Sequence, residues 1–186
     1  MSPLTAARRR GAAVRRPPSA VEAATAPDAQ QLRSCDHECA DLGGAELAGS
    51  DLTGAYLAGS DLHGADLTGA DLSGACLRGA DLRGARLGAA RLQRTVLRGA
   101  DLTGADLTGS DASNANLERA RLVDARCEHA RLDGANLFGA DLTGAHLEYA
   151  VLTDTVLTSA VLTGTMLTGT VLDDPAPDGP DGPRAA

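Results

Sequence analysis

Leucine recurs at every fifth position between Leu42 and Leu172, and 25 of the 27 positions in this register hold it. Ala112 and Cys127 fill the other two. In an α-helix, a step of five residues rotates successive side chains by about 140°, which spreads the leucines around the whole helix. In a flat strand, an odd step sends successive leucines to opposite faces. The period therefore predicts a chain that bends once per five residues and stacks its repeats around a shared leucine core.

The other positions of the five-residue repeat fit this geometry. Two residues before each leucine lies a small residue, usually alanine, as at Ala65 and Ala105. An aspartate or a substitute precedes the leucine directly, and a variable residue, often threonine, follows it. The last position is mostly glycine, as at Gly64 and Gly104, where a tight bend is easiest without a Cβ. The pattern predicts the leucine and the small residue inside, and the aspartate and threonine positions outside.

The sequence Ala-Asp-Leu-Thr-Gly occurs at residues 65–69, 100–104, 105–109 and 140–144. It resembles the consensus of the pentapeptide-repeat family, and the resemblance covers residues 40–174. This resemblance implies an all-β fold, a right-handed quadrilateral β-helix (a pentapeptide-repeat solenoid) with four pentads per coil and so about seven coils.

One feature of the sequence favours four pentads per coil independently of the resemblance. Five arginines replace the usual acid before leucine. Eight of the ten positions that lie four pentads from these arginines hold aspartate, against six of ten at a distance of three pentads. The arginines are Arg86, Arg91, Arg121, Arg126 and Arg131.

The segments that flank the repeats differ in composition. Residues 1–27 are rich in Arg, Ala and Pro without an apolar run, which predicts a disordered arm. Residues 28–39 are predicted to form a short helical cap on the first coil, and the Pro/Gly/Asp-rich residues 175–186 a disordered tail. The chain shows neither the apolar core of a signal peptide nor a membrane span, so we expect a cytoplasmic location. The absence of acids before Glu22 leaves an organelle transit peptide open as a second interpretation.

Charge is unevenly distributed along the chain. The net charge is −8, with +2 in residues 1–39 and −9 in residues 40–174. The repeat itself explains most of the acids, because a short aspartate side chain bonds to nearby backbone in Asx turns. The acids before leucine also form a candidate acidic partner-binding surface. Its residues are Asp41, Glu46, Asp51, Asp61, Asp66, Asp71, Asp101, Asp106 and Asp111.

The family resemblance implies two functions for such a surface. Bacterial members similar to this chain include quinolone-resistance and self-immunity proteins that resemble duplex DNA and bind DNA gyrase. A rigid rod with regular negative charges fits a basic groove that binds phosphates. The first hypothesis is therefore that the chain is a non-catalytic DNA mimic. It would bind DNA gyrase or another topoisomerase, confer antibiotic resistance or self-immunity, and make no direct contact with nucleic acid. The alternative is a protein–protein interaction scaffold or adaptor without mimicry, which the arginines within residues 78–98 and 119–131 favour.

The position before leucine becomes apolar in five consecutive pentads near the C-terminal end. β-Branched residues favour extended backbone, which is one explanation. The other is a contact surface for a partner or for a second copy of the chain, since the resemblance implies a homodimer through the C-terminal end. Residues 173–186 lack the apolar helix that often completes such a dimer. The apolar residues are Val151, Val156, Val161, Met166 and Val171.

Candidate catalytic and cofactor chemistry is sparse, and the sequence predicts a protein that is not an enzyme and takes no cofactor. Cys35, His37 and Cys39 lack the fourth ligand of a zinc site, so we expect no metal. The glycines are corners of the repeat rather than a phosphate-binding loop, and a rod filled by its own leucines offers no concave cavity. Cys76 and Cys127 are expected to be free thiols, as in a reducing compartment.

Overall fold

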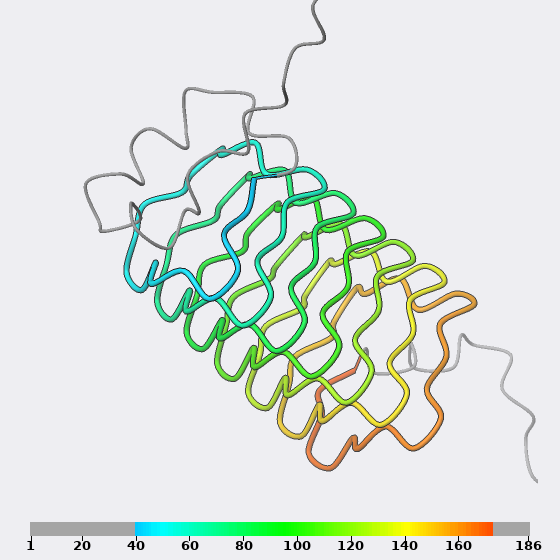
Figure 1. Ribbon diagram of the computed structural model, residues 1–186. Coiled ribbons are helices and arrows are strands. Elements are labelled where there is room, and N and C mark those ends of the chain that lie inside the picture. Colours follow the sequence, from blue (N-terminus) through cyan, green and yellow to red (C-terminus); the bar gives the residue numbers. More distant parts are fainter. Residues whose placement is uncertain (1–39, 173–186) are drawn as a thin grey trace, which may run out of the picture.

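A computed structural model describes residues 40–172, which wind into a stack of similar four-sided coils (Figure 1). Within this range the chain forms no helix and no strand longer than a single residue. Instead, each pentad contributes one residue to an isolated parallel β-bridge and then makes a turn. The all-β prediction is therefore confirmed as bridges and turns rather than as extended strands. The predictions for residues 1–27, 28–39 and 175–186 lie outside the described residues.

Every β-bridge joins a residue to the one four pentads later, from Asp41 with Asp61 to Val151 with Val171. The bridges are parallel, so successive coils run in the same direction. A coil therefore closes after four pentads, as the arginine positions favour. Positions four pentads apart lie one above the other, and each face of the rod carries a column of such positions.

The corner between two faces is a β-turn that begins at leucine. The N–H of Ala45 donates to the C=O of Leu42 at 3.0 Å, and the third turn residue, Gly44, has a φ of +66°. A positive φ at this position alone is the signature of a type II turn, in which glycine avoids a Cβ clash. Nine corners hold another residue in the same conformation. They are Ala89, Arg94, Asn114, Arg119, Asp124, His129, Tyr149, Asp154 and Ser159.

A corner side chain leans toward the corner of the following coil. A Cβ on Gly144 would collide with the Asp124 carboxylate, and a Cβ on Gly169 would lie 2.5 Å from the Tyr149 ring. His129 and Tyr149, at the same corner of successive coils, stack with ring centroids 5.2 Å apart. Glycine at residues 144 and 169 thus leaves space for the larger side chain at the corner of the preceding coil.

The interior is filled by two side chains per pentad, as predicted. The leucines and the small residues before them are buried from Leu42 to Leu152, and Ala112 and Cys127 are buried in the leucine register. Threonine fits the small position because its hydroxyl finds a partner: Thr95 Oγ1 donates to the C=O of Leu72 at 2.8 Å. A solid interior of this kind leaves the outer faces as the places where another molecule can bind.

Candidate partner-binding surfaces

Four columns of residues that precede leucine run along the rod, one on each face. The first column is Asp41, Asp61, Asp81, Asp101, Arg121, Asp141 and Val161. The second is Glu46, Asp66, Arg86, Asp106, Arg126, His146 and Met166. The third is Asp51, Asp71, Arg91, Asp111, Arg131, Val151 and Val171. The fourth is Tyr56, Cys76, Val96, Asn116, Asn136 and Val156, and it holds no acid.

The aspartates of these columns have a structural role within their own pentads. The Oδ1 atom accepts the backbone N–H two residues later, as from Thr103 to Asp101 at 3.0 Å and from Thr143 to Asp141 at 3.0 Å. Asn136 accepts the N–H of Phe138 in the same way, at 3.0 Å. The Asx turn therefore explains a short side chain with an acceptor oxygen at this position without a binding function, and a neutral amide makes the same bond as a carboxylate.

These hydrogen bonds favour the charged form of the carboxylates. The Thr143 hydroxyl, which donates to Asp141 at 2.6 Å, and the Thr143 N–H hold the pKa of that carboxyl below its ordinary value. At Asp106, partial burial opposes ionisation most strongly, but the hydroxyl and N–H of Thr108 and the nearby arginines still lower the pKa. The lowered pKa of Asp106 and Asp141 keeps both carboxylates charged at neutral pH.

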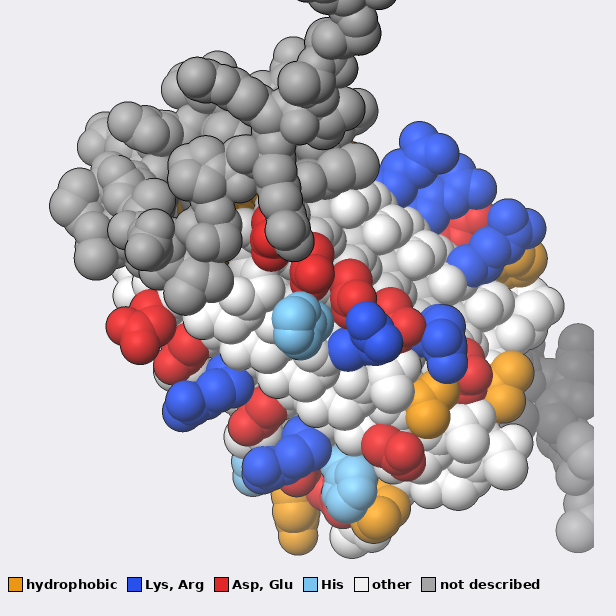
Figure 2. All heavy atoms as spheres, viewed as in Figure 1, with side chains coloured by type: hydrophobic (Ala, Val, Ile, Leu, Met, Phe, Trp, Pro, Cys, Tyr) orange, Lys and Arg blue, Asp and Glu red, His pale blue; other side chains and the backbone are white. Residues whose placement is uncertain are grey.

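Arginines neutralise most of the candidate acidic surface. Each arginine that precedes leucine reaches back to the aspartate of the preceding coil in its own column. The pairs are Arg86–Asp66 at 3.3 Å, Arg91–Asp71 at 3.5 Å, Arg121–Asp101 at 3.1 Å, Arg126–Asp106 at 3.6 Å and Arg131–Asp111 at 3.7 Å. Figure 2 shows the resulting mixture of acidic and basic side chains along one face.

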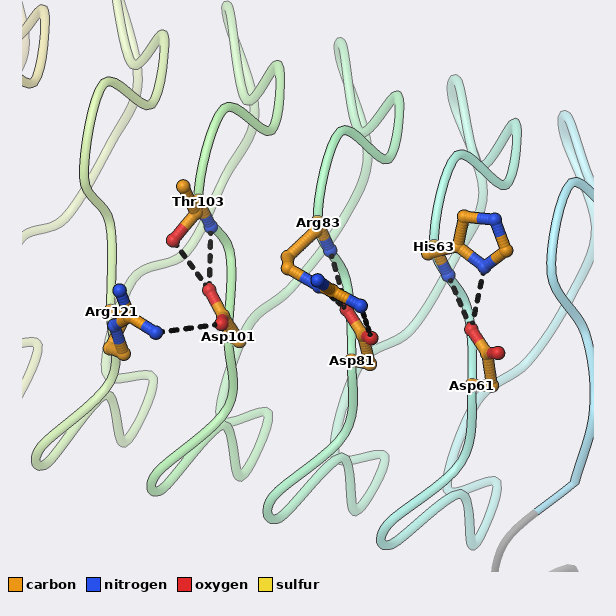
Figure 3. Close-up of polar contacts among 7 residues, drawn as sticks. All are labelled: Asp61, His63, Asp81, Arg83, Asp101, Thr103 and Arg121. Atoms are coloured by element: carbon orange, nitrogen blue, oxygen red, sulfur yellow. Dashed lines mark hydrogen bonds and ion pairs between the residues drawn. The ribbon is translucent and has the colours of Figure 1, made fainter.

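The first column keeps the longest run of acids. Asp61, Asp81 and Asp101 follow one another along this face (Figure 3). His63 lies 2.9 Å from the Asp61 carboxylate, and Arg83 Nε donates to Asp81 at 2.8 Å. Even here, each carboxylate of the close-up has a basic or hydroxyl neighbour. At the N-terminal end, Asp41 and Glu46 form no ion pair with residues 40–172.

The structure brings the predicted apolar residues together in the final coil, residues 151–172. Val151 is half-buried, whereas Val156, Val161, Met166 and Val171 have exposed fractions of 44%, 45%, 45% and 50%. They occupy all four columns, so the apolar surface surrounds the end of the rod instead of covering one face.

The final coil also exposes core residues that the repeat pattern places inside. The exposed fractions of Leu162, Leu167 and Leu172 are 39%, 41% and 49%. The burial prediction is wrong for these leucines because no coil among the described residues follows theirs. A sequence signal for this end exists in the prolines from Pro175 onward, which cannot donate to a β-ladder.

The backbone of the final coil is an open ladder edge. In the preceding coil, Leu142 N–H donates to the C=O of Val161 at 2.8 Å. The equivalent N–H groups of Leu157, Leu162 and Leu167 have no acceptor within residues 40–172. An exposed edge of this kind is a template for pairing with another chain.

Side chains suited to metal binding or nucleophilic chemistry do not converge in the described part of the chain. No group of three or more His, Cys, Asp or Glu side chains within residues 40–172 has the arrangement of a metal site. Cys35, His37 and Cys39 lie outside those residues. Cys127 is buried, which raises the pKa of its thiol to about 12, and Cys76 is half-buried in the fourth column. Residues 40–172 contain no helix with the length and apolarity needed to cross a bilayer.

Comparison with protein-family models gives a match to pentapeptide repeats, in eight copies within residues 31–174. Matched segments are residues 31–64, 38–74, 75–111, 100–137 and 135–174. This family folds as a right-handed quadrilateral β-helix, in agreement with the parallel, four-pentad register of the structure. Comparison with curated protein sequences gives no match.

Three solved structures illustrate the similarity. HetL from the cyanobacterium Nostoc, a pentapeptide-repeat protein involved in heterocyst differentiation regulation, is 30% identical over 68% of this chain and 76% of its own, with a TM-score of 0.41. Rfr23 from the cyanobacterium Cyanothece is 34% identical over 58% of this chain and 64% of its own, with a TM-score of 0.30. QnrB1, a plasmid-mediated fluoroquinolone resistance protein, is 21% identical over 66% of this chain and 86% of its own, with a TM-score of 0.31. TM-scores this low support no functional argument.

Proposed function

Because this chain belongs to the pentapeptide-repeat family, we propose that it is a non-catalytic protein that binds another protein through the outer surface of its rod. Its interior is occupied by its own leucine and alanine side chains, so the core offers no space for a substrate. Binding on the outside uses exposed apolar side chains, or polar groups without a partner in the described part of the chain. A rigid rod of about seven coils presents such groups at fixed spacing.

The observation that carries this function is the apolar final coil. Outward Val156, Val161 and Met166 lie next to inward leucines that are also exposed, and the leucine N–H groups of this coil have no acceptor within residues 40–172. Apolar area and free backbone donors at one place fit a partner that supplies apolar side chains and backbone carbonyls. A second copy of the chain has these properties, and we include a homodimer through the C-terminal end among the partners.

DNA mimicry is the second candidate function, with DNA gyrase or another topoisomerase as the partner and resistance to quinolone-type antibiotics, or self-immunity, as the outcome. The observation that favours it is the first column, where Asp41, Asp61, Asp81 and Asp101 occupy four consecutive positions, although Arg83 pairs with Asp81 and Arg121 with Asp101. The arginine pairs on the second and third columns oppose it, because they cancel the negative field of those faces. We therefore place a protein-binding scaffold or adaptor ahead of the mimic.

A charge-introduction experiment tests the scaffold. In the full chain, Val156→Asp, Val161→Asp and Met166→Asp together place three charges on the final coil. Asn116→Asp with Asn136→Asp is the matched control, because each new aspartate can accept the same N–H bond that the asparagine now accepts. Chemical cross-linking with mass spectrometry identifies a bound partner, and sedimentation equilibrium of the purified chain measures self-association. We expect the triple variant to lose these contacts and the control to keep them; unchanged association would reject the final coil as the interface.

The mimic makes a different prediction with the same protein. Asp61→Asn with Asp81→Asn removes two charges of the first column while keeping an amide that can form the Asx turn. If mimicry operates, the natural chain inhibits gyrase supercoiling at low salt, the effect fades as salt rises, and the double variant inhibits less. Absence of inhibition at low salt would remove this candidate.

We place this activity in the cytoplasm. Cys76 and Cys127 are free thiols, as expected for a protein kept in a reducing compartment.

A further inference from the structure

A shallow polar depression lies on the third face of the rod, at the coil where the chain is richest in arginine. Its volume is about 510 Å³, within the range of sites that take small molecules. Residues that line it are Ser73, Gly74, Arg91, Gln93, Arg94 and Asn114. Gly74 has no side chain, and nothing lies within 4 Å of the place where its Cβ would be, so the corner at Gly74 is open.

Arg94 differs from most other arginines of the rod. Arg86, Arg91 and Arg121 each pair with an acid, whereas Arg94 has neither an ion pair nor a side-chain hydrogen bond with residues 40–172. Its side chain is exposed, and none of its guanidinium donors is used by another described residue. Only Arg78, on the fourth face, shares this property within the described residues.

The carboxylates near the depression are already engaged. Asp71 accepts the N–H of Ser73 at 3.0 Å and pairs with Nη1 of Arg91 at 3.5 Å. Asp111 accepts Nε2 of Gln93 at 2.8 Å and pairs with Arg131 at 3.7 Å. Because these acids have their own donors and cations, the positive charge of Arg94 is not cancelled locally.

The polar floor of the depression is held in place by the same network. Ser73 Oγ donates to Oε1 of Gln93 at 2.8 Å, and Nε2 of Gln93 donates in turn to the Asp111 carboxylate. Gln93 is therefore held by hydrogen bonds on both sides. Arg91 and Arg94 are the two cationic residues that line the depression. Arg91 uses one nitrogen for Asp71 and retains further donors.

The backbone at Arg94 adds a second observation. Arg94 occupies a corner with a φ of +57°, a conformation that 17 corners of the rod meet with glycine. A residue with a Cβ is less stable than glycine in this conformation. Stability of the repeat thus favours glycine at residue 94, yet an arginine occupies this corner and lines the depression.

From this arrangement we propose that the depression binds a phosphate group through Arg94 and the free donors of Arg91. Guanidinium groups bind phosphate oxygens with short, charge-assisted and often bidentate hydrogen bonds. The phosphate comes either from inorganic phosphate or from a small phosphomonoester, and the volume of the depression accommodates both. This site is separate from the final coil, so it neither requires nor excludes the protein-binding function.

Titration calorimetry of the full chain at low salt tests the site, with inorganic phosphate in one arm and glycerol phosphate in the other. We expect saturable binding of at least one ligand, weakened roughly tenfold or more by Arg94→Gly, because the variant removes the unpaired guanidinium. Arg94→Gly restores the usual corner residue, so its melting temperature should equal or exceed that of the natural chain.

Arg78→Ala is the matched control, since it removes the other unpaired arginine on a different face and should leave binding unchanged. Binding of glycerol phosphate alone identifies a phosphomonoester as the ligand, and binding of both ligands identifies the phosphate group itself. Absence of saturable binding in both arms, or equal weakening by Arg78→Ala and Arg94→Gly, overturns the site.

Discussion

The charged coils, residues 40–150, and the final coil, residues 151–172, repeat the same pentad but present different surfaces. In the charged coils Leu102 is fully buried, whereas Leu167 in the final coil is 41% exposed. The outer positions differ as well. Arg121 pairs with Asp101 in the first column, and Val161 ends that same column.

This difference shows that a position in the repeat does not by itself decide burial. A leucine becomes core only when a coil follows its own, because the following coil covers it and accepts its N–H. Two neighbouring coils therefore have the same backbone conformation, but burial of their leucines contributes differently to stability. The end of the rod keeps the geometry of the repeat, yet within residues 40–172 no following coil covers its apolar groups or accepts the N–H groups of its leucines.

The largest expected effect comes from removing one leucine in each region. Leu102→Ala should lower the free energy of unfolding by about 2–5 kcal/mol, because it opens a cavity in a packed interior. Leu167→Ala should cost only about 1–2 kcal/mol, since part of the side chain is already in water and no closed cavity forms. Urea unfolding followed by circular dichroism measures both. Equal losses would mean that Leu167 is covered in solution, and sedimentation equilibrium would then show whether a second copy covers it.

A smaller effect, of opposite sign in the two regions, is expected at the small interior position. In the final coil, Thr165 Oγ1 donates to the C=O of Leu142 at 2.8 Å, whereas the buried Oγ of Ser110 in the charged coils has no partner within the described residues. Thr165→Val keeps the volume and should lower stability by about 1 kcal/mol through the lost hydrogen bond. Ser110→Ala should leave stability unchanged or raise it by up to about 1 kcal/mol, because a buried hydroxyl without a partner is costly. Destabilisation by Ser110→Ala in thermal melts would show that this hydroxyl has a partner in solution, such as a water molecule.

The smallest expected effect is on the acid sensitivity of the charged coils. The folded-state pKa of Asp66 and Asp141 is lowered, first by the hydroxyls of Thr68 and Thr143. A lowered folded pKa contributes stability that is complete above the unfolded value of 3.8 and is lost as the pH falls through the folded value. Asp66→Asn with Asp141→Asn should therefore flatten the fall in melting temperature below that pH.

Asn136→Asp provides the reciprocal control for this titration. Asn136 accepts the N–H of Phe138 at 3.0 Å, so an aspartate there should gain the same bond and steepen the loss of stability in acid. If neither set of variants changes the slope of melting temperature against pH, the Asx carboxylates do not control acid stability.

Much of the fold follows from the sequence because the interactions that form it are local or strictly periodic. The buried leucine and alanine positions from Leu42 to Leu152, the corners and the four pentads per coil are predicted correctly, whereas the burial of Leu162, Leu167 and Leu172 is not. The candidate surfaces are predicted only in part. Val156, Val161, Met166 and Val171 are exposed as a group, but the sequence alone does not show that their coil also exposes Leu162.

The ion pairs illustrate the same limit for the charged coils. The sequence places an aspartate four pentads before and four pentads after Arg86, Arg91 and Arg121, and it leaves open which of the two each arginine meets. Arg86 has an aspartate both above and below it, and in the structure it pairs with the earlier one, Asp66. Side-chain direction relative to the rod axis decides this choice, and a one-dimensional pattern does not contain that direction.

For this protein, the sequence by itself determined the five-residue turn, the leucine core and the supply of charges, since each depends on a residue's place in its own pentad. Only the tertiary structure decided which charges cancel, which corner side chains need glycine in the next coil, and where the core meets solvent. Those outcomes depend on whether the adjacent coil supplies a neighbour and on the direction in which its side chain leans. The five residues of one pentad determine neither of these.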